Sequence, residues 1–253
     1  MNAQEHTPPK KLNEFFANRP IAATLLLAVV TLVLQYLPSF VFPILDTAYQ
    51  KFIGKTAISI FAIIMLSTLG WWKKAYFASP SRWKMWAPFI PLFLLPLIFA
   101  LFSEFNVTDP AQIAFFALYT FIVGFAEESI VRGLMLTTLR STGVVQAVLL
   151  SSIIFGFMHL ANLMIGADIG STVTQVIYAT LIGIAFAGTL QAGGSIWLLI
   201  IIHALIDFFS KLSGTSGGDS SMNIASALIS IGIQIPFALY GWWMLRRYMR
   251  ISG

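Results

Sequence analysis

Residues 121–135, FIVGFAEESIVRGLM, place three ionisable side chains inside a stretch that is otherwise apolar. Two adjacent carboxylates, Glu127 and Glu128, are followed closely by Arg132. A helix of about 20 predominantly apolar residues is long enough to cross a bilayer. An ionisable group inside a membrane costs at least a few kcal/mol unless it is paired or faces a cavity. The stretch therefore predicts a membrane-embedded helix that carries part of a functional site.

The composition of the whole chain agrees with a membrane protein. Of its 253 residues, 58% are hydrophobic and only 10% are charged, whereas soluble domains carry about 25% charged residues. We expect an all-α polytopic membrane helix bundle, with a single transmembrane domain over residues 20–250. Residues 1–19 are polar and contain prolines, so they predict a flexible cytoplasmic tail and no cleavable signal peptide. The chain has no cysteine, which excludes disulfides and thiolate metal sites.

Eight apolar segments are long enough to span a membrane. They cover roughly residues 20–43, 52–72, 86–103, 112–138, 143–164, 171–191, 194–211 and 222–245. Prolines 88, 91 and 96 predict a kinked third segment. Small residues recur every four positions in the sixth segment, at Ala179, Gly183 and Ala187, and predict close contact with a neighbouring helix. No internal repeat is visible, so the inverted-repeat pattern of many transporters is missing.

The basic residues predict the orientation of the bundle. If the N-terminus is cytoplasmic and all eight segments span, three lysines, Lys51, Lys55 and Lys211, fall on the outer side. Eleven basic residues then fall on the cytoplasmic side: Lys10, Lys11, Arg19, Lys73, Lys74, Arg82, Lys84, Arg140, Arg246, Arg247 and Arg250. Basic residues concentrate in cytoplasmic loops, so we expect a multi-pass protein with both termini in the cytoplasm. The net charge of +5 thus reflects anchoring in membrane lipid and does not indicate nucleic acid as a partner.

Helical spacing divides the charges of the fourth segment. Glu128 and Arg132 are four residues apart, in the order that favours an ion pair on one helix face. Glu127 and Glu128 are adjacent, so their side chains leave the helix about 100° apart. We therefore expect the two carboxylates not to face one site together. Glu128 and Arg132 would form a structural pair, and Glu127 would be available as a general base.

The fifth and seventh segments supply the remaining ionisable candidates. His203 and Asp207 are four residues apart, and Asp207 can fix the tautomer and orientation of the imidazole. Phe155 and His159 also share a helix face. Each has a structural alternative: a lone histidine can join two helices by a hydrogen bond, a Glu–Arg pair can hold a helix in place, and Phe155 can serve packing alone.

Three short motifs on these segments resemble one family. EESIVR (127–132), FGFMH (155–159) and HALID (203–207) are similar to the EExxxR, FxxxH and HxxxN/D motifs of the CPBP family, the Abi-like intramembrane proteases that include CAAX prenyl proteases and bacteriocin-processing enzymes. The resemblance covers roughly residues 85–211, the expected protease core. It implies an eight-helix bundle in a bacterial cell membrane, with a cavity opening to the cytoplasmic side.

The resemblance also implies residue roles. Glu127 would activate water, His159 would help to hold that water, and His203 with Asp207 would stabilise the oxyanion. Glu128, Arg132 and Phe155 would support them. The family often has Asn at the last motif position; an ionised Asp207 cannot donate a hydrogen bond, so it would orient His203 or act as a protonated donor.

The function that the resemblance implies is that of an intramembrane endopeptidase acting on a membrane-associated protein or peptide, lipidated or not. We expect no cofactor; zinc held by His159, His203 and Glu127 is the alternative, since these would leave a fourth position open for water. A non-catalytic membrane regulator or bacteriocin-immunity protein and an ion-coupled transporter are the rival functions. Neither the substrate nor the oligomeric state can be read from the sequence.

Overall fold

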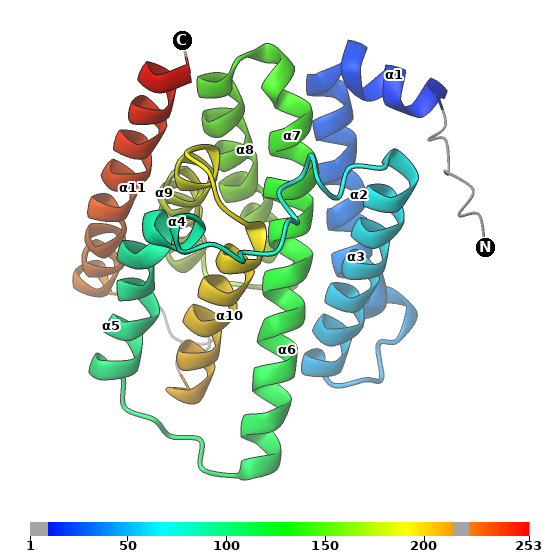
Figure 1. The fold of residues 1–253 in the computed structure, drawn as a ribbon. Coiled ribbons are helices and arrows are strands. Elements are labelled where there is room, and N and C mark those ends of the chain that lie inside the picture. The colour runs from blue at the N-terminus through cyan, green and yellow to red at the C-terminus, as the bar shows by residue number, and fades with distance from the viewer. Residues whose placement is uncertain (1–9, 215–222, 253) are drawn as a thin grey trace.

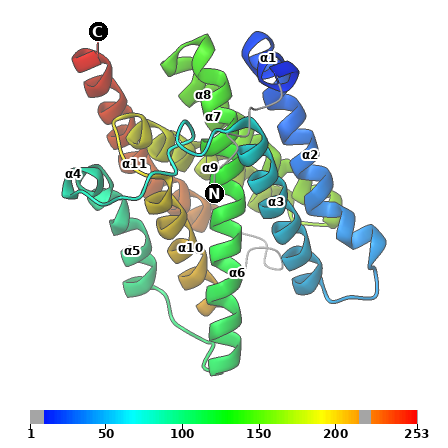
Figure 2. The same cartoon turned by 45° about the vertical axis from the view of Figure 1, so that its right-hand side comes forward.

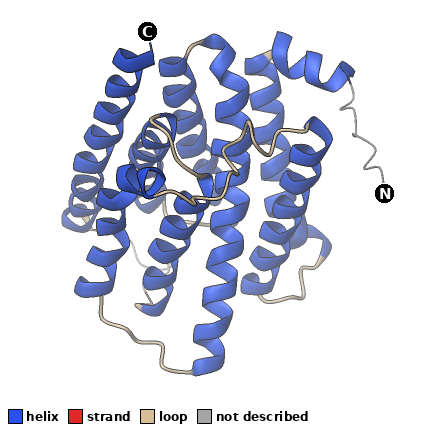
Figure 3. Cartoon of the chain, viewed as in Figure 1, coloured by secondary structure: helices blue, strands red, loops and turns tan. Residues whose placement is uncertain are grey.

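A computed structural model describes residues 10–214 and 223–252. These residues form helices joined by short connections and contain no strand (Figure 3). In chain order the helices are α1 (Lys10–Asn18), α2 (Pro20–Val41), α3 (Thr47–Leu69), α4 (Trp83–Trp86), η1 (Ala87–Phe93), α5 (Leu94–Phe102), α6 (Pro110–Glu128), η2 (Ser129–Met135), α7 (Leu136–Leu139), η3 (Arg140–Thr142), α8 (Val144–Met158), η4 (His159–Ile165), α9 (Ile169–Gln191), α10 (Ile196–Leu212) and α11 (Ile224–Ser252).

The predicted polytopic helix bundle is confirmed. Within the described residues, seven helical segments are long and apolar enough to cross a membrane: Pro20–Val41, Thr47–Leu69, Trp83–Phe102, Pro110–Thr142, Val144–Ile165, Ile169–Gln191 and Ile224–Ile251. The remaining predicted span, 194–211, corresponds to α10, which has 17 residues. At 1.5 Å per residue α10 is about 26 Å long, slightly less than a hydrocarbon core of about 30 Å.

The prolines interrupt the third span as expected. Residues 83–102 form the short helix α4, the 3₁₀ segment η1 with Pro91 inside it, and then α5. Proline lacks the amide hydrogen that an α-helix requires and its ring clashes with the preceding turn. The chain therefore changes its helical geometry here without leaving the bundle.

The N-terminal tail is partly ordered, which corrects the prediction of a flexible segment over residues 1–19. Residues 10–18 form α1, and its Phe16 is buried. The Phe16 ring meets the Trp71 ring edge-on at 5.5 Å, and the Trp71 indole N–H donates to Asn13 Oδ1 at 3.0 Å. These contacts bury apolar area that a polar tail would leave exposed. Residues 1–9 lie outside the described part of the chain.

The bundle has two distinct ends (Figures 1 and 2). The terminal end carries α1, the turn at residues 140–143 and the C-terminal part of α11. The distal end carries the α5–α6 connection, residues 103–109, and the C-terminal part of α10. The Asn106 amide donates to the Leu212 carbonyl at 2.9 Å and so ties these two segments together.

Small residues bring α9 close to two neighbouring helices. A Cβ atom at Gly183 would lie 2.8 Å from Cβ of Ser152 in α8, and one at Gly188 would overlap the backbone carbonyl of Gly241 in α11. Ala179 and Ala187 are buried on the same helix. The predicted small-residue ridge thus packs against α8 at Gly183, and Gly188 beside it packs against α11.

Candidate active site

The helix that carries the two glutamates changes geometry immediately after them. The α-helix α6 ends at Glu128 and continues as η2, where the Leu136 amide bonds the Val131 carbonyl, five residues back. This π-helical spacing is rare and frequently occurs at functional sites. Every residue of η2 is buried. The segment holds Arg132 against the two glutamates inside the bundle.

The predicted pair between Glu128 and Arg132 is present. Arg132 Nη1 lies 3.2 Å from Glu128 Oε1, and both side chains are almost completely buried. The guanidinium lies over the Phe155 ring, 4.7 Å from its centroid, and 5.5 Å from that of Phe186. Aromatic faces attract a guanidinium most strongly where water is excluded. Phe155 therefore covers the cation of the buried pair.

His203 is held by Glu128. Its Nδ1 lies 2.8 Å from Glu128 Oε1, while its Nε2 lies 3.7 Å from Asp207 Oδ2, too far for a hydrogen bond. An ionised carboxylate only accepts hydrogen bonds, so Nδ1 carries the hydrogen. This differs from the expectation that Asp207 orients the ring. The i,i+4 spacing places Asp207 beside His203 along α10, but the carboxylate of Glu128 in α6 comes closer.

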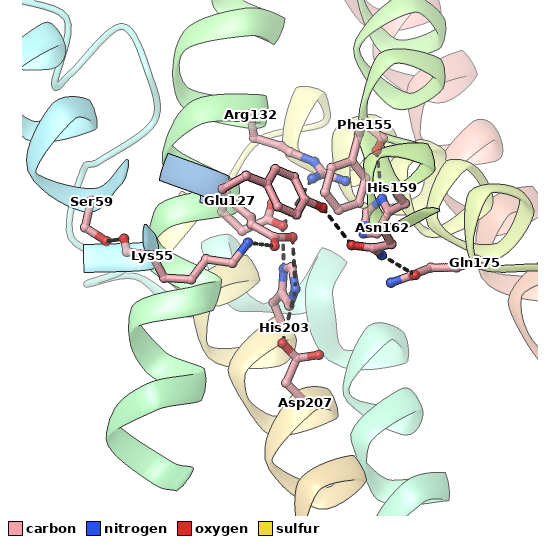
Figure 4. A network of polar contacts seen from close by, with 12 residues as sticks. Lys55, Ser59, Glu127, Arg132, Phe155, His159, Asn162, Gln175, His203 and Asp207 are labelled. Atoms are coloured by element: carbon pink, nitrogen blue, oxygen red, sulfur yellow. Dashed lines mark hydrogen bonds and ion pairs between the residues drawn. The ribbon is translucent and has the colours of Figure 1, made fainter. Parts of the chain in front are cut away.

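Glu127 has two neighbours. Its Oε1 accepts a hydrogen bond from Lys55 Nζ at 2.6 Å, and its Oε2 lies 3.6 Å from His203 Nε2 (Figure 4). Both glutamates therefore contact the same imidazole, contrary to our expectation from their 100° separation. The ring lies between them and presents a different nitrogen to each.

Lys55 is a site residue that the sequence analysis missed. It belongs to α3, which we did not expect to contribute, and we had counted it among the outer-side cations. It lies about two turns into the helix, within the predicted span 52–72. The rule that marks intramembrane glutamates and histidines as functional candidates applies to a lysine in the same position, so this signal was available in the sequence.

His159 lies at the junction of α8 and η4 and bonds its own helix. Its Nδ1 is 2.9 Å from the Phe155 carbonyl oxygen, and its ring meets the Phe155 ring edge-on at 5.0 Å. Because a carbonyl oxygen only accepts, Nδ1 donates, and Nε2 keeps its lone pair in the neutral ring. His159 can therefore accept a hydrogen bond from a water molecule.

A chain of neutral polar side chains continues the site beyond His159. The Tyr36 hydroxyl donates to Asn162 Oδ1 at 2.8 Å. Asn162 Nδ2 donates to Gln175 Oε1 at 2.9 Å (Figure 4). The chain joins α2, η4 and α9. None of the three lies in a motif or carries a charge, which is why the sequence analysis passed over them.

All seven predicted site residues line one cavity of about 140 Å³. Its lining comprises Glu127, Glu128, Arg132, Phe155, His159, Gln175, Tyr178, Ala179, Ile182, Phe186, His203, Ile206 and Asp207. Segments far apart in the sequence, on α6, η2, α8, η4, α9 and α10, therefore meet at one point. The chemistry predicted for these residues requires this convergence.

Exposure within the cavity rises in one direction. Side-chain exposure is 0% for Glu128, 1% for Arg132, 14% for His203, 17% for Glu127 and 34% for Asp207. Asp207 is the nearest of the five to the C-terminus of α10, at the distal end, whereas Arg132 lies toward α7 and the terminal end. Among the described residues, the ionisable side chains are thus least exposed toward the terminal end and most exposed toward the distal end.

The side chains proposed as zinc ligands do not fit a metal ion in this arrangement. No group of three or more His, Asp or Glu side chains among the described residues is disposed to hold one. The Lys55 ammonium lies 2.6 Å from Glu127, where it competes with a second cation, and Glu128 holds one nitrogen of His203. We therefore derive no catalytic step that involves a metal.

Comparison with known families agrees with the motifs. Residues 109–209 match the family described as Type II CAAX prenyl endopeptidase Rce1-like. The match starts at Asp109, the N-cap of α6, and contains all three motifs, which confirms the predicted resemblance to the CPBP family. It leaves out Lys55 and all of α3. No curated protein matches the chain.

Proposed function

We propose that this protein is an intramembrane endopeptidase that hydrolyses a peptide bond with a water molecule activated by Glu127. The observation that carries the proposal is the convergence of Glu127, His159 and His203 on one cavity inside a membrane helix bundle. Peptide hydrolysis needs a base for the water, a donor for the developing oxyanion and an acid for the leaving amine. The family match makes an intramembrane protease the expected class.

Glu127 suits the part of the base better than Glu128 does. Glu128 is completely buried, and its Oε1 is shared by Arg132 and His203. Glu127 is partly exposed to the cavity, and its Oε2 faces away from Lys55 toward His203. A substrate entering the cavity therefore reaches Glu127, while Glu128 lies behind it.

The proposed reaction has two proton transfers. Water held by Glu127 and by Nε2 of His159 attacks the carbonyl carbon of the scissile bond, and its proton passes to Glu127. The oxyanion that forms accepts a hydrogen bond from Nε2–H of a protonated His203, whose other nitrogen donates to Glu128. Glu127 then gives its proton to the amide nitrogen, the C–N bond breaks, and the new carboxyl and amino ends leave.

We also propose the face of the membrane from which the substrate enters the cavity. The basic residues predict a cytoplasmic terminal end, and Asp207, the most exposed ionisable side chain that lines the cavity, lies on α10 toward the distal end. Together these favour entry from the outer face of the membrane, in contrast to the cytoplasmic opening that the family resemblance implies. The substrate would be a membrane-associated protein or peptide, and the name of the matched family makes a lipidated peptide the first one to test.

Cells that express wild-type protein or the Glu127→Gln or His203→Gln variant test the proposal. New N- and C-terminal peptides in their membranes are identified by mass spectrometry. We expect a set of termini that is present with the wild type and absent with both variants. Glu104→Gln serves as the control, because it removes the same charge from an exposed loop residue at the distal end. If all four proteins produce the same termini, the protease function is refuted.

A further inference from the structure

Lys55 makes the shortest ionic contact to the proposed base. The distance from Lys55 Nζ to Glu127 Oε1 is 2.6 Å, and both side chains are mostly buried, with exposures of 15% and 17%. Hydrogen bonds between two charged groups are roughly twice as strong as those between neutral groups. The lysine comes from α3, outside residues 109–209 and outside all three motifs. No feature of the family pattern accounts for it.

The pair is not needed to attach α3 to α6. Aromatic contacts already join these helices near the distal end: the Phe52 and Phe115 rings are 5.9 Å apart, the Phe52 and Tyr119 rings 6.3 Å, and the Tyr49 and Phe115 rings 6.4 Å. Burying an ammonium inside this interface costs desolvation energy that an apolar side chain would avoid. The lysine therefore has a use beyond holding two helices together.

The charges of the site form two matched pairs. Arg132 balances the completely buried Glu128, and Lys55 balances the partly exposed Glu127. Removing Lys55 would leave Glu127 with only His203 as a partner, 3.6 Å away and already bonded to Glu128, in a low-dielectric interior where an incompletely paired charge is disfavoured. A protonated Glu127 could not take a proton from water.

We propose that Lys55 is a positioning residue for the hydrolysis, holding Oε1 of Glu127 so that Oε2 is the oxygen that receives the proton of water. The inference rests on the function proposed above. It follows from the placement of the two oxygens, since Oε1 is occupied by the ammonium and Oε2 lies beside His203 Nε2, 3.6 Å away. Lys55 thereby keeps the base ionised and sets its direction toward the scissile bond.

Three single variants test the role of Lys55. Lys55→Met removes the ammonium, Lys55→Arg keeps a cation that can reach the carboxylate, and Lys51→Met removes the same charge one turn earlier on α3, at an exposed position. The substrate is a synthetic peptide that spans a cleavage site shown to depend on Glu127. The assay determines kcat and KM for each purified protein in liposomes, per mole of protein that elutes as a single species.

A misdirected base loses turnover and not affinity, so we expect kcat of Lys55→Met to fall on the order of 100-fold with KM unchanged. Lys55→Arg should retain activity within about tenfold of the wild type, because a guanidinium also pairs with a carboxylate. Lys51→Met should match the wild type. Equal kcat values for Lys55→Met and Lys51→Met would overturn the proposal. So would a loss in Lys55→Met that appears only in KM.

The double variant Lys55→Met/Glu127→Gln separates positioning from folding. It removes both charges of the pair and leaves neither charge without its partner, so it should melt at or above the temperature of Lys55→Met. Because Glu127→Gln is itself expected to be inactive, melting temperature is the readout: if Lys55 acts through Glu127, Lys55→Met should lower it less in the Glu127→Gln background than in the wild type. An equal drop in melting temperature in both backgrounds would show that Lys55 does not act through Glu127 and would refute the proposal. Wild-type activity in Glu127→Gln would instead refute the protease mechanism itself.

Discussion

Replacing Arg132 by Met should destabilise the fold through the carboxylate that is left behind. Arg132 Nη1 and Glu128 Oε1 are 3.2 Å apart, and both side chains are buried. At that distance two unit charges attract by about 5 kcal/mol if the effective dielectric constant is about 20. Removing one partner of a buried pair typically costs about 3–5 kcal/mol. Glu128 keeps its bond to His203 at 2.8 Å, so we expect a loss of about 3 kcal/mol, at the lower end of this range.

Thermal unfolding of the purified protein in detergent measures this loss. For a domain of this size a change of 1 kcal/mol moves Tm by roughly 2–4 °C, so Arg132→Met should melt about 6–12 °C below the wild type. Adding Glu128→Gln removes the unpaired charge, and the double variant should recover part of the loss. Double-mutant coupling between contacting residues is about 0.5–3 kcal/mol. If the two single changes simply add, the ion pair does not support the fold and the reasoning fails.

Three other predictions concern the metal, the orientation and the packing. Treating the protein with a strong zinc chelator should leave peptide cleavage unchanged, because the donor set does not fit a metal; loss of activity that added zinc restores would show that zinc is required. The chain has no cysteine, so a single Gln112→Cys at the distal end should react with a membrane-impermeant maleimide in intact cells, and Ser141→Cys at the terminal end should not; the opposite labelling would reverse the orientation. Gly188→Ala should lower the free energy of unfolding by about 1–3 kcal/mol, since its methyl group meets the Gly241 carbonyl, whereas an unchanged Tm would show that α9 and α11 can move apart.

Most residues of the candidate site could be predicted from the sequence, because an ionisable side chain inside a membrane is energetically costly. Glu127, Glu128, Arg132, His159, His203 and Asp207 were identified because they are ionisable residues in long apolar segments, and all of them line the cavity. Spacing along one helix was also sufficient to predict the Glu128–Arg132 pair. Contacts of this kind are local, because residues four apart on a helix are neighbours wherever that helix lies.

Contacts between helices were not predictable in the same way. The position of His203 between the two glutamates depends on how α10 packs against α6. Helix periodicity does not predict the rotation of one helix relative to another. The four-residue spacing therefore predicts that His203 and Asp207 are neighbours, but it does not predict the closer bond from His203 to Glu128. Lys55 was not predicted as a site residue for another reason. It lies near the predicted start of its span, where a lysine is ordinarily an interfacial anchor, and only the packing of α3 shows that it reaches Glu127.

The arrangement around His203 explains why two adjacent glutamates are useful in a hydrolytic site. A single carboxylate would have to bind the imidazole and also accept the proton of water. One side-chain orientation would not allow it to do both. Here Glu128, paired with Arg132, binds Nδ1, while Glu127, paired with Lys55, faces Nε2. Each carboxylate has its own cation, so one can change protonation during the reaction while the other keeps the ring in place. Under this reasoning Glu128→Gln should reduce turnover through His203, and Glu127→Gln should abolish it.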